Sequence, residues 1–322
     1  ADKAEYAKVE ALGKVTRFDK MDEIHIDAVL KMKHVDVSAI RKAGFKVVID
    51  CVNSVGGIIL PVLLEKLGVE VIKLYCDPTG IFPHNPEPLP QHLGDIAKAV
   101  VAAKADAGFV VDPDVDRLVI VNEDGSMFGE EYTLVAVADY ILSQEPGNTV
   151  SNLSSTRALA DITARYGGIY KAAPVGEVNV VNEMKRINAV IGGEGNGGII
   201  YPALHYGRDA LVGIALFLSS LARSGKKCSE LRKTFPDYFN SKNKIELNPG
   251  VNVDELIAKI RTRYEKHPID DRDGIRIDFD REWVHLRKSN TEPIIRIYSE
   301  AKSLKEAEEV GKQVIDIVQE LK

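Results

Sequence analysis

Short apolar segments rich in β-branched residues alternate along most of the chain with segments of helical periodicity. Strands are predicted at 45–49, 69–74 and 109–111, and helices at 58–67 and 96–104 lie between them. Two parallel strands can be joined only by a crossover, which is usually a helix. The alternation therefore predicts a mainly parallel sheet buried between helices, as in α/β proteins.

The same alternation resumes after a hairpin turn and continues until the composition changes at 236–244, a segment predicted to be a linker. Beyond it, the pattern predicts a helix, strands of alternating polarity and a long amphipathic helix. We expect an α/β fold class with two consecutive α/β domains that contain mixed, mainly parallel sheets, followed by a small α+β C-terminal domain with an antiparallel sheet. The predicted bounds are 1–30 for an N-terminal lead-in segment, then 31–128, 129–240 and 241–322.

Composition excludes several classes of partner. The net charge of −6 argues against a nucleic acid or an anionic membrane held by bulk charge, so individual arginines must bind any anionic substrate. The three cysteines are widely spaced, which favours reduced thiols over a disulfide framework or a zinc site. No apolar run has the length of a transmembrane helix, and the N-terminus is charged. We therefore expect a cytoplasmic protein with no nucleic-acid or membrane partner.

Residues 109–117 place three carboxylates at alternate positions after an apolar run, in the sequence Phe-Val-Val-Asp-Pro-Asp-Val-Asp-Arg. Asp112, Asp114 and Asp116 can supply hard oxygen ligands to one small divalent cation. Arg117 can bind an oxyanion beside that cation. A metal next to an arginine suits phosphoryl transfer, which depends on positioning and on neutralisation of charge.

Three other structures would use the same residues. An EF-hand would require a glycine where Arg117 stands, and helices where both flanks resemble strands. A phosphatase of the haloacid dehalogenase type would use Asp112 as its nucleophile, in a pattern completed by Asp114 and Val115. An acidic turn between two strands, exposed to solvent, would have no chemical role.

A second loop is rich in glycine and spans residues 192–198, Gly-Gly-Glu-Gly-Asn-Gly-Gly. Glycines allow the backbone to approach a ligand closely, and Glu194 and Asn196 offer groups that can bind sugar hydroxyls. A flexible hinge is the alternative. Arg208 precedes a predicted helix whose N-terminus could assist an anion, and it is either a salt-bridge partner or a contact to the ligand.

A third loop, 287–293, lies between two predicted strands of the last domain. Arg287 can donate to two phosphate oxygens, and Ser289, Asn290 and Thr291 add further donors. Together they could hold a dianion without a metal. A polar hairpin turn without function is the alternative.

In this order the loops resemble those of the α-D-phosphohexomutase family, which includes phosphoglucomutases, phosphomannomutases and phosphoglucosamine mutases. Residues 112–117 are similar to its metal loop, which usually reads Asp-Gly-Asp-Gly-Asp-Arg. Residues 193–198 are similar to its sugar-recognition loop, and residues 287–293 to its phosphate-binding loop. The resemblance extends over essentially the whole chain.

The resemblance implies an isomerase of carbohydrate metabolism that moves a phosphoryl group between the 1- and 6-hydroxyls of a hexose or hexosamine phosphate. A phosphoserine of the enzyme would give its phosphoryl group near Mg²⁺, with a hexose 1,6-bisphosphate as intermediate and activator. The three aspartates of the metal loop would hold Mg²⁺, and Arg117 would face the phosphoserine. The expected substrate contacts are Glu194, Asn196, Arg208, Arg287, Ser289, Asn290 and Thr291.

The chain departs from the family pattern at several points. Members have a first domain with a Thr-Ala-Ser-His-Asn-Pro-like segment whose serine carries the phosphoryl group, and no segment of this sequence matches it. We therefore expect a chain that is inactive alone, with the missing first domain of the same enzyme as its partner. Pro113 and Val115 replace glycines of the metal loop, and Gly198 stands where many relatives have histidine.

These differences leave the choice among glucose, mannose and glucosamine open. Two other functions also remain open from the sequence. One is the phosphatase with Asp112 as nucleophile, and the other is a module that binds sugar phosphate without turnover.

Overall fold

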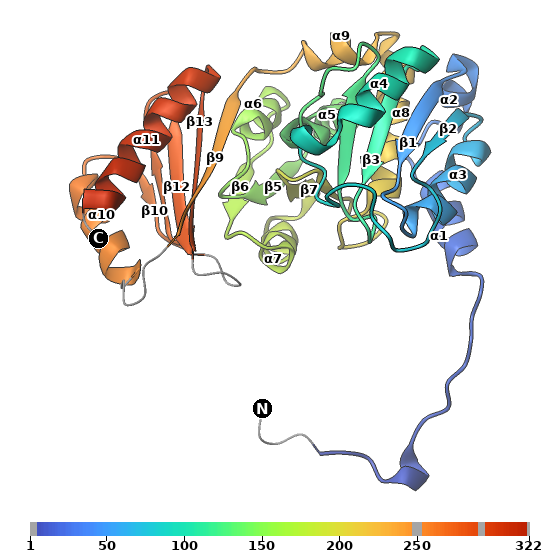
Figure 1. Ribbon diagram of the computed structural model, residues 1–322, viewed down its shortest axis with the longest axis horizontal. Helices are drawn as coiled ribbons and strands as arrows, with labels where there is room; N and C mark the ends of the chain where they lie inside the picture. Colours follow the sequence, from blue (N-terminus) through green and yellow to red (C-terminus); the bar gives the residue numbers. More distant parts are fainter. Residues whose placement is uncertain (1–4, 247–252, 289–293, 321–322) are drawn as a thin grey trace.

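The computed structural model describes residues 5–246, 253–288 and 294–320, which form three sheets flanked by helices (Figure 1). The first two sheets combine parallel and antiparallel strands, and the third is antiparallel. The predicted fold class is therefore confirmed. The short elements outside these layers are η1 (Val9–Ala11), η2 (Pro90–His92) and α9 (Cys228–Arg232).

The first sheet carries the metal loop at the end of a fully buried strand. It consists of β1 (Lys46–Asp50), β2 (Glu70–Leu74), β3 (Ala107–Val111) and β4 (Leu118–Asn122), in the order β2-β1-β3-β4. Helix α4 (Gly94–Ala103) covers one face, and α3 (Gly56–Lys66) and α8 (Ala210–Ser224) cover the other. Successive side chains of β3 point to opposite faces, and both faces are covered, which explains the continuous apolar run of this strand.

The second sheet repeats this arrangement and carries the glycine-rich loop. It consists of β5 (Asn148–Asn152), β6 (Tyr170–Ala173), β7 (Ala189–Glu194) and β8 (Gly198–Ile200), in the order β6-β5-β7-β8. Helix α7 (Glu177–Ile187) packs on one face, and α5 (Glu130–Gln144) and α6 (Ala158–Arg165) pack on the other. The hairpin between β7 and β8 holds the glycine-rich loop at the end of this sheet.

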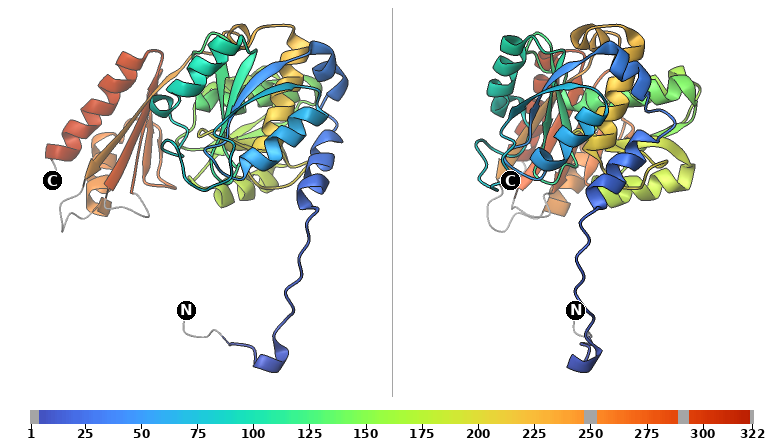
Figure 2. Two further views of the ribbon diagram at one scale, coloured as in Figure 1. Left: turned by 45° about the vertical axis from the view of Figure 1, so that its right-hand side comes forward. Right: turned by 90° about the vertical axis from the view of Figure 1, so that its right-hand side faces the viewer.

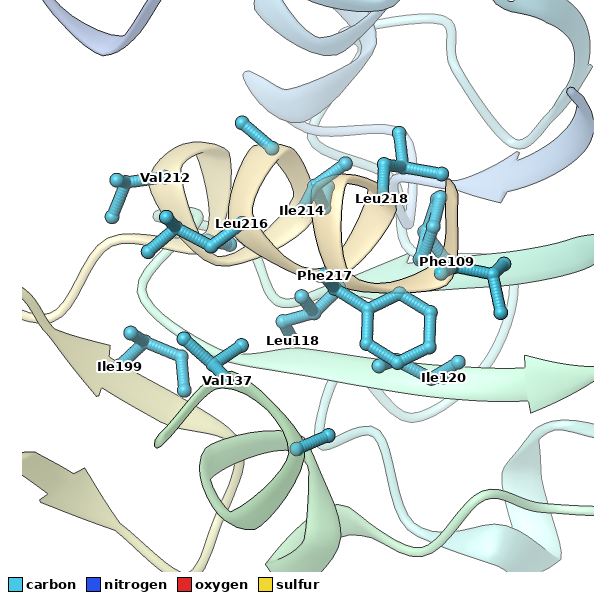
Figure 3. Packing of buried hydrophobic residues seen from close by; sticks show 14 of the residues in the cluster. Phe109, Leu118, Ile120, Val137, Ile199, Val212, Ile214, Leu216, Phe217 and Leu218 are labelled. Atoms are coloured by element: carbon cyan, nitrogen blue, oxygen red, sulfur yellow. The ribbon is translucent and has the colours of Figure 1, made fainter. Parts of the chain in front are cut away.

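Both sheets share one hydrophobic core, and α8 runs through it. This helix packs against α5, α2 (Val37–Ala43) and α1 (Met21–Leu30), and it also contacts the first sheet through β4. Figure 3 shows the Phe217 ring directed from α8 toward Ile120 of β4. The same ring meets Phe109 edge-on, with centroids 6.1 Å apart, and Phe128 at 5.3 Å. The two α/β units are thus joined by a common apolar interior.

The third sheet is antiparallel and has its helices on one face. It consists of β9 (Phe239–Glu246), β10 (Ile269–Asp270), β11 (Ile275–Asp278), β12 (Trp283–Lys288) and β13 (Ile294–Ala301), in the order β10-β11-β12-β13-β9. Helices α10 (Val253–Arg263) and α11 (Leu304–Glu320) lie on the face that points away from the other two sheets (Figures 1 and 2). The opposite face is turned toward the second sheet.

The prediction of a linker at 236–244 is wrong for most of that segment. Residues 239–246 form the edge strand β9, which pairs with β13 from Phe239 opposite Ala301 to Glu246 opposite Ile294. Only Ser241 and Ile245 of this strand are buried. A strand with so few apolar contacts has the polar composition of a linker, because most of its side chains face solvent or other polar groups.

Polar groups fill the contact between the second and third sheets. Ser154 Oγ lies 2.8 Å from His285 Nδ1, and Arg276 Nη1 donates to the Leu153 carbonyl at 2.6 Å. Burial lowers the pKa of His285 to about 4, so this ring is neutral near pH 7. Hydrogen bonds made by the neutral His285 and the charged Arg276 therefore join the third sheet to the second.

Two expectations from composition can be compared with the structure. All three cysteines, Cys51, Cys76 and Cys228, are free thiols, as expected. In the part of the chain that the structure describes, no helix combines the length and the apolar character needed to cross a membrane.

Candidate functional site

Described residues from each of the three predicted loops line one cleft, although Asp112, Asp114 and Asp116 are not among its lining residues. This cleft has a volume of about 800 Å³ and lies where the ends of the first two sheets meet the third. The predicted site residues that line it are Arg117, Glu194, Asn196, Arg208 and Arg287. Ser289, Asn290 and Thr291 lie outside the described residues.

The metal loop begins directly after β3 and folds back on itself. Asp112 Oδ1 accepts hydrogen bonds from the backbone N–H groups of Asp116 and Arg117, each at 3.0 Å. One carboxylate oxygen from each of Asp112, Asp114 and Asp116 lies within 4.8 Å of the others. Asp116 Oδ1 is buried and has no hydrogen-bond partner among the described residues. Three converging carboxylates with an unpaired oxygen fit a small hard cation such as Mg²⁺.

The charge of this loop also favours a cation. Burial raises the pKa of Asp112 to about 7, and repulsion from Asp116 and Asp114 contributes to the rise. Arg117 Nε lies 3.5 Å from Asp112 Oδ2 and 3.7 Å from Asp116 Oδ1, too far for a hydrogen bond. The negative charge of the three aspartates is thus only partly compensated by Arg117.

Val115 adopts a backbone conformation that glycine normally provides. Its φ of +62° lies in the left-handed region, which is unfavourable for a β-branched residue by about 1 to 2 kcal/mol. The side chain is buried, and the carbonyl oxygen accepts the Ala210 N–H at 3.0 Å. Val115 therefore holds a conformation that a glycine would adopt without this cost.

The glycine-rich loop is attached to the metal loop by backbone contacts. Leu118 N donates to the Gly197 carbonyl at 3.0 Å, and Arg117 forms a β-bridge with Gly198. A Cβ atom on Gly197 would lie 2.4 Å from the Leu118 carbonyl oxygen, so only glycine allows this approach. The sequence predicted a loop that could approach a ligand closely. In the structure, Gly197 approaches the neighbouring domain.

Glu194 is buried, and both of its carboxylate oxygens accept hydrogen bonds. Its Oε1 accepts from Asn152 Nδ2 at 2.9 Å and from Gly176 N at 3.1 Å, and its Oε2 accepts from Arg208 Nη1 at 2.7 Å. Asn196 Oδ1 accepts from Gly198 N at 3.2 Å. Glu194 Oε2 accepts one bond from a described residue, so it has a second acceptor site that a sugar hydroxyl could use.

Arg208 connects the two loops. Its guanidinium donates to Asp116 of the metal loop, to Glu194 of the glycine-rich loop and, at 3.0 Å, to Glu177 Oε2 at the start of α7. Burial by itself would lower the pKa of Arg208, but Glu194, Asp116 and Glu177 raise it above its ordinary value. In this structure the arginine forms ion pairs and also lines the cleft.

Arg287 reaches the cleft from the end of β12. Its Nε lies 3.2 Å from Asp273 Oδ2, and the same carboxylate oxygen accepts the Val175 N–H at 2.9 Å. Asp273 thus ties the arginine to the second sheet. Arg287 lines the cleft, and among the described residues only its Nε has a hydrogen-bond partner, so the other two guanidinium nitrogens could donate to an anion.

Sequence reasoning missed polar residues that line the same cleft. Lys242 of β9 lies 2.5 Å from Glu130 Oε1 and 3.6 Å from Glu131 Oε1. Burial raises the pKa of Glu131 to about 8. No sequence signal could have found Lys242, because its strand has the composition of a linker and its partner Glu130 lies 112 residues earlier in the chain.

Three family models match the chain. The phosphoglucomutase/phosphomannomutase alpha/beta/alpha domain II matches residues 23–125, alpha/beta/alpha domain III matches 129–239, and the phosphoglucomutase/phosphomannomutase C-terminal domain matches 242–317. A phosphoglucomutase/phosphomannomutase of Thermococcus kodakarensis is 37% identical over 318 residues, which are 98% of this chain and 69% of that protein. A phosphoglucosamine/phosphogalactosamine mutase of Sulfurisphaera tokodaii is 30% identical over 311 residues, 95% of this chain and 68% of that protein.

A solved structure has the same architecture. A phosphoglucomutase/phosphomannomutase family protein from Burkholderia thailandensis superimposes with a TM-score of 0.80 at 27% sequence identity. The match covers 94% of this chain and 65% of that chain. The 322 residues therefore span about two thirds of the length of the proteins they resemble.

Proposed function

The chain belongs to the phosphoglucomutase/phosphomannomutase family, and we propose that it contributes the metal, sugar and phosphate sites of a phosphohexomutase. The proposed reaction moves a phosphoryl group between the 1- and 6-hydroxyls of a hexose or hexosamine phosphate. The observation that supports it is the meeting of three loops, at residues 112–117, 193–198 and Arg287, around one cleft. A binding site for a phosphate and a polyol beside a metal site is what such a substrate requires.

At one end of the cleft, Asp112, Asp114 and Asp116 would hold Mg²⁺, and Arg117 would face the phosphoryl group in transfer. The bound ion would neutralise charge on the phosphoryl oxygens. The aspartates converge on one point, and the unpaired Asp116 Oδ1 supports this assignment. The Arg117 guanidinium lies beside Asp112 and Asp116 without a hydrogen bond to either, so it could turn to an oxyanion bound next to these aspartates.

At the other end, Arg287 would bind the phosphate that does not react. Glu194 and Asn196 would contact sugar hydroxyls, and Ser289, Asn290 and Thr291 would add donors to the phosphate. Binding energy from this remote end would orient the reacting hydroxyl toward the metal loop. A hexose 1,6-bisphosphate, as the intermediate, could bind in either direction because each of its ends is a phosphate.

The phosphoryl carrier is proposed to lie outside these residues. None of the 322 residues forms a Thr-Ala-Ser-His-Asn-Pro-like segment, and without a covalent carrier the chain has no phosphoryl group to give or take back. We propose a division into domains at 31–128, 129–240 and 241–322, preceded by a lead-in segment at 1–30. A domain with the phosphoserine would complete the site from the open side of the cleft.

The proposal is tested by assaying interconversion of the 1- and 6-phosphates of glucose, mannose and glucosamine with Mg²⁺ and a hexose 1,6-bisphosphate. We expect no turnover by the chain alone, and turnover when the serine-containing domain of a family member is fused to it. Changing that serine to alanine should abolish the activity. Comparable turnover by the chain alone would contradict the proposal, and release of phosphate with a phosphoaspartate at Asp112 would favour the phosphatase alternative.

Replacing Asp114 by asparagine is expected to weaken Mg²⁺ binding by about tenfold or more. Loss of a partner that only supports a ligand typically costs a metal site 10- to 100-fold, and Asp114 is assigned as a direct ligand. Its side chain is exposed, so the fold should not change. Titration calorimetry measures the effect, with Asp124→Asn in the nearby turn as the matched control. Equal affinities of the Asp114 variant and the unmodified chain would remove the metal assignment.

Replacing Arg287 by lysine is expected to weaken the binding of hexose 6-phosphate by about 1 to 3 kcal/mol, the range for a charge-assisted hydrogen bond. Lysine keeps the charge but loses the planar fork that can donate to two phosphate oxygens. Arg272→Lys is a suitable control, since Arg272 contacts the second sheet through the Ala172 carbonyl but does not line the cleft. An effect of Arg117→Lys without an effect of Arg287→Lys would move the phosphate site to the metal loop.

A further inference from the structure

A second cluster of potential metal ligands lies apart from the three aspartates. It consists of His25 on α1, His205 in the turn before α8, and Asp209, the N-cap residue of α8. The cluster joins parts of the chain that are 184 residues apart. It has no residue in common with the cleft described above, and the proposed function does not use it.

The two imidazoles converge on a single carboxylate oxygen. Asp209 Oδ2 lies 2.7 Å from His25 Nε2 and 3.0 Å from His205 Nε2. One ligand atom from each residue lies within 4.8 Å of the others, and the two ring centroids are 5.7 Å apart. Three ligand atoms of the types N, N and O thus surround one small space.

Hydrogen bonds to the second carboxylate oxygen of Asp209 fix the orientation of this side chain. Asp209 Oδ1 accepts the backbone N–H groups of Leu211 at 2.8 Å and Val212 at 3.2 Å. This oxygen therefore caps the helix, and Oδ2 remains for the histidines. Hydrogen bonds of this kind orient the ligands of metal sites and maintain their geometry.

The spacing is close to that of a tetrahedral zinc site. Zinc bonds of about 2.0 to 2.2 Å to nitrogen and oxygen place neighbouring ligand atoms about 3.3 Å apart. The two N–O distances would have to open by about 0.6 Å and about 0.3 Å. The histidine side chains are 29% and 42% exposed, so the rings have room to move and water can reach a fourth position.

We infer that His25, His205 and Asp209 form a binding site for one divalent cation of intermediate softness, of which Zn²⁺ is the best example. Imidazole nitrogen favours such an ion over Mg²⁺, whereas the all-oxygen set of Asp112, Asp114 and Asp116 has the opposite preference. Bound there, the ion replaces the two protons that now lie between the histidines and Asp209. It fastens α1 to α8 and so to the core that both α/β units share.

Titration calorimetry with ZnCl₂, in the presence of saturating Mg²⁺, tests this site. Mg²⁺ occupies the aspartate loop, and repeating the titration in Asp114→Asn removes any remaining contribution of that loop. We expect one Zn²⁺ ion per chain, and binding weakened by at least about tenfold in His25→Ala and in His205→Ala. His92→Ala, which changes a histidine outside the cluster, should bind Zn²⁺ like the unmodified chain.

Thermal unfolding gives a second measurement. An ion that binds only the folded chain raises the midpoint temperature as its concentration increases. We expect Zn²⁺ to raise the midpoint in the unmodified chain and in His92→Ala, and not in His205→Ala, whose exposed side chain can be removed without loss of the fold. Absence of Zn²⁺ binding, or binding that is unchanged in both cluster variants, would overturn the inference.

Discussion

Replacing Phe217 by alanine is expected to lower the free energy of unfolding by about 3 to 5 kcal/mol, the usual range for a buried phenylalanine. The side chain is fully buried, and its ring contacts Phe109 and Phe128 edge-on (Figure 3). Phe109 lies in the fully buried strand β3, and Phe128 also packs against Phe235, so the cavity cannot close without disturbing these contacts. Urea unfolding, followed by circular dichroism, measures the loss.

Phe239→Ala is the matched control, because this phenylalanine lies on the edge strand β9 and is 40% exposed. Its removal should cost about 1 kcal/mol or less. The single core that joins the first two sheets also predicts that both α/β units unfold together. Equal losses for the two variants, or a Phe217→Ala effect confined to one of two separate transitions, would contradict the shared core.

The elements of the fold could be predicted where burial leaves a clear pattern. Strand β3 is buried on both faces, so its sequence is an unbroken apolar run, and the terminal helix α11 shows the apolar stripe of a one-sided helix. Its N-terminus is capped by Ser303, whose Oγ accepts the Glu306 N–H at 3.2 Å. Such local patterns reflect the environment of one element and need no knowledge of its partners.

The arrangement of elements could not be predicted in the same way. Helix α8 is apolar on nearly all sides, which shows that it is buried but not which layers bury it. Strand β9 was missed because an edge strand with two buried side chains resembles a linker. Both cases have one cause: partners far away in the sequence determine the environment, and the local composition does not record them.

The candidate site shows the same division. The aspartates at 112–116, the glycine-rich loop and Arg287 were indicated by residue types that suit a ligand, and their roles stay predictions. The contacts of Arg208 could not be predicted, since Asp116 lies 92 residues earlier in the chain and Glu177 lies 31 residues earlier. From the sequence, Arg208 could be either a salt-bridge partner or a ligand contact. The structure gives it three carboxylate partners, of which Glu177 and Glu194 line the cleft.

Replacing Arg208 by alanine is expected to lower the free energy of unfolding by about 3 to 5 kcal/mol, the cost of removing one partner from a buried ion pair. The arginine side chain is 14% exposed, and Asp116 and Glu194 are mostly buried beside it. Without the guanidinium these two carboxylates would repel each other and remain poorly hydrated. The loops of the first and second sheets should then separate, which also weakens the binding of sugar phosphate.

Two comparisons separate this charge effect from loss of packing. Adding Glu194→Gln to Arg208→Ala should recover part of the stability, because one of the two buried charges is removed while Asn152 and Gly176 can still donate to the amide oxygen. Mg²⁺ should stabilise Arg208→Ala more than the unmodified chain, since the ion would neutralise Asp116 in place of the arginine. Arg186→Ala, which breaks an exposed ion pair with Glu183 on α7, should leave the unfolding midpoint unchanged. If Arg208→Ala were as stable as Arg186→Ala, or if neither the added Glu194→Gln change nor Mg²⁺ restored stability, the guanidinium would not be the element that joins the two loops.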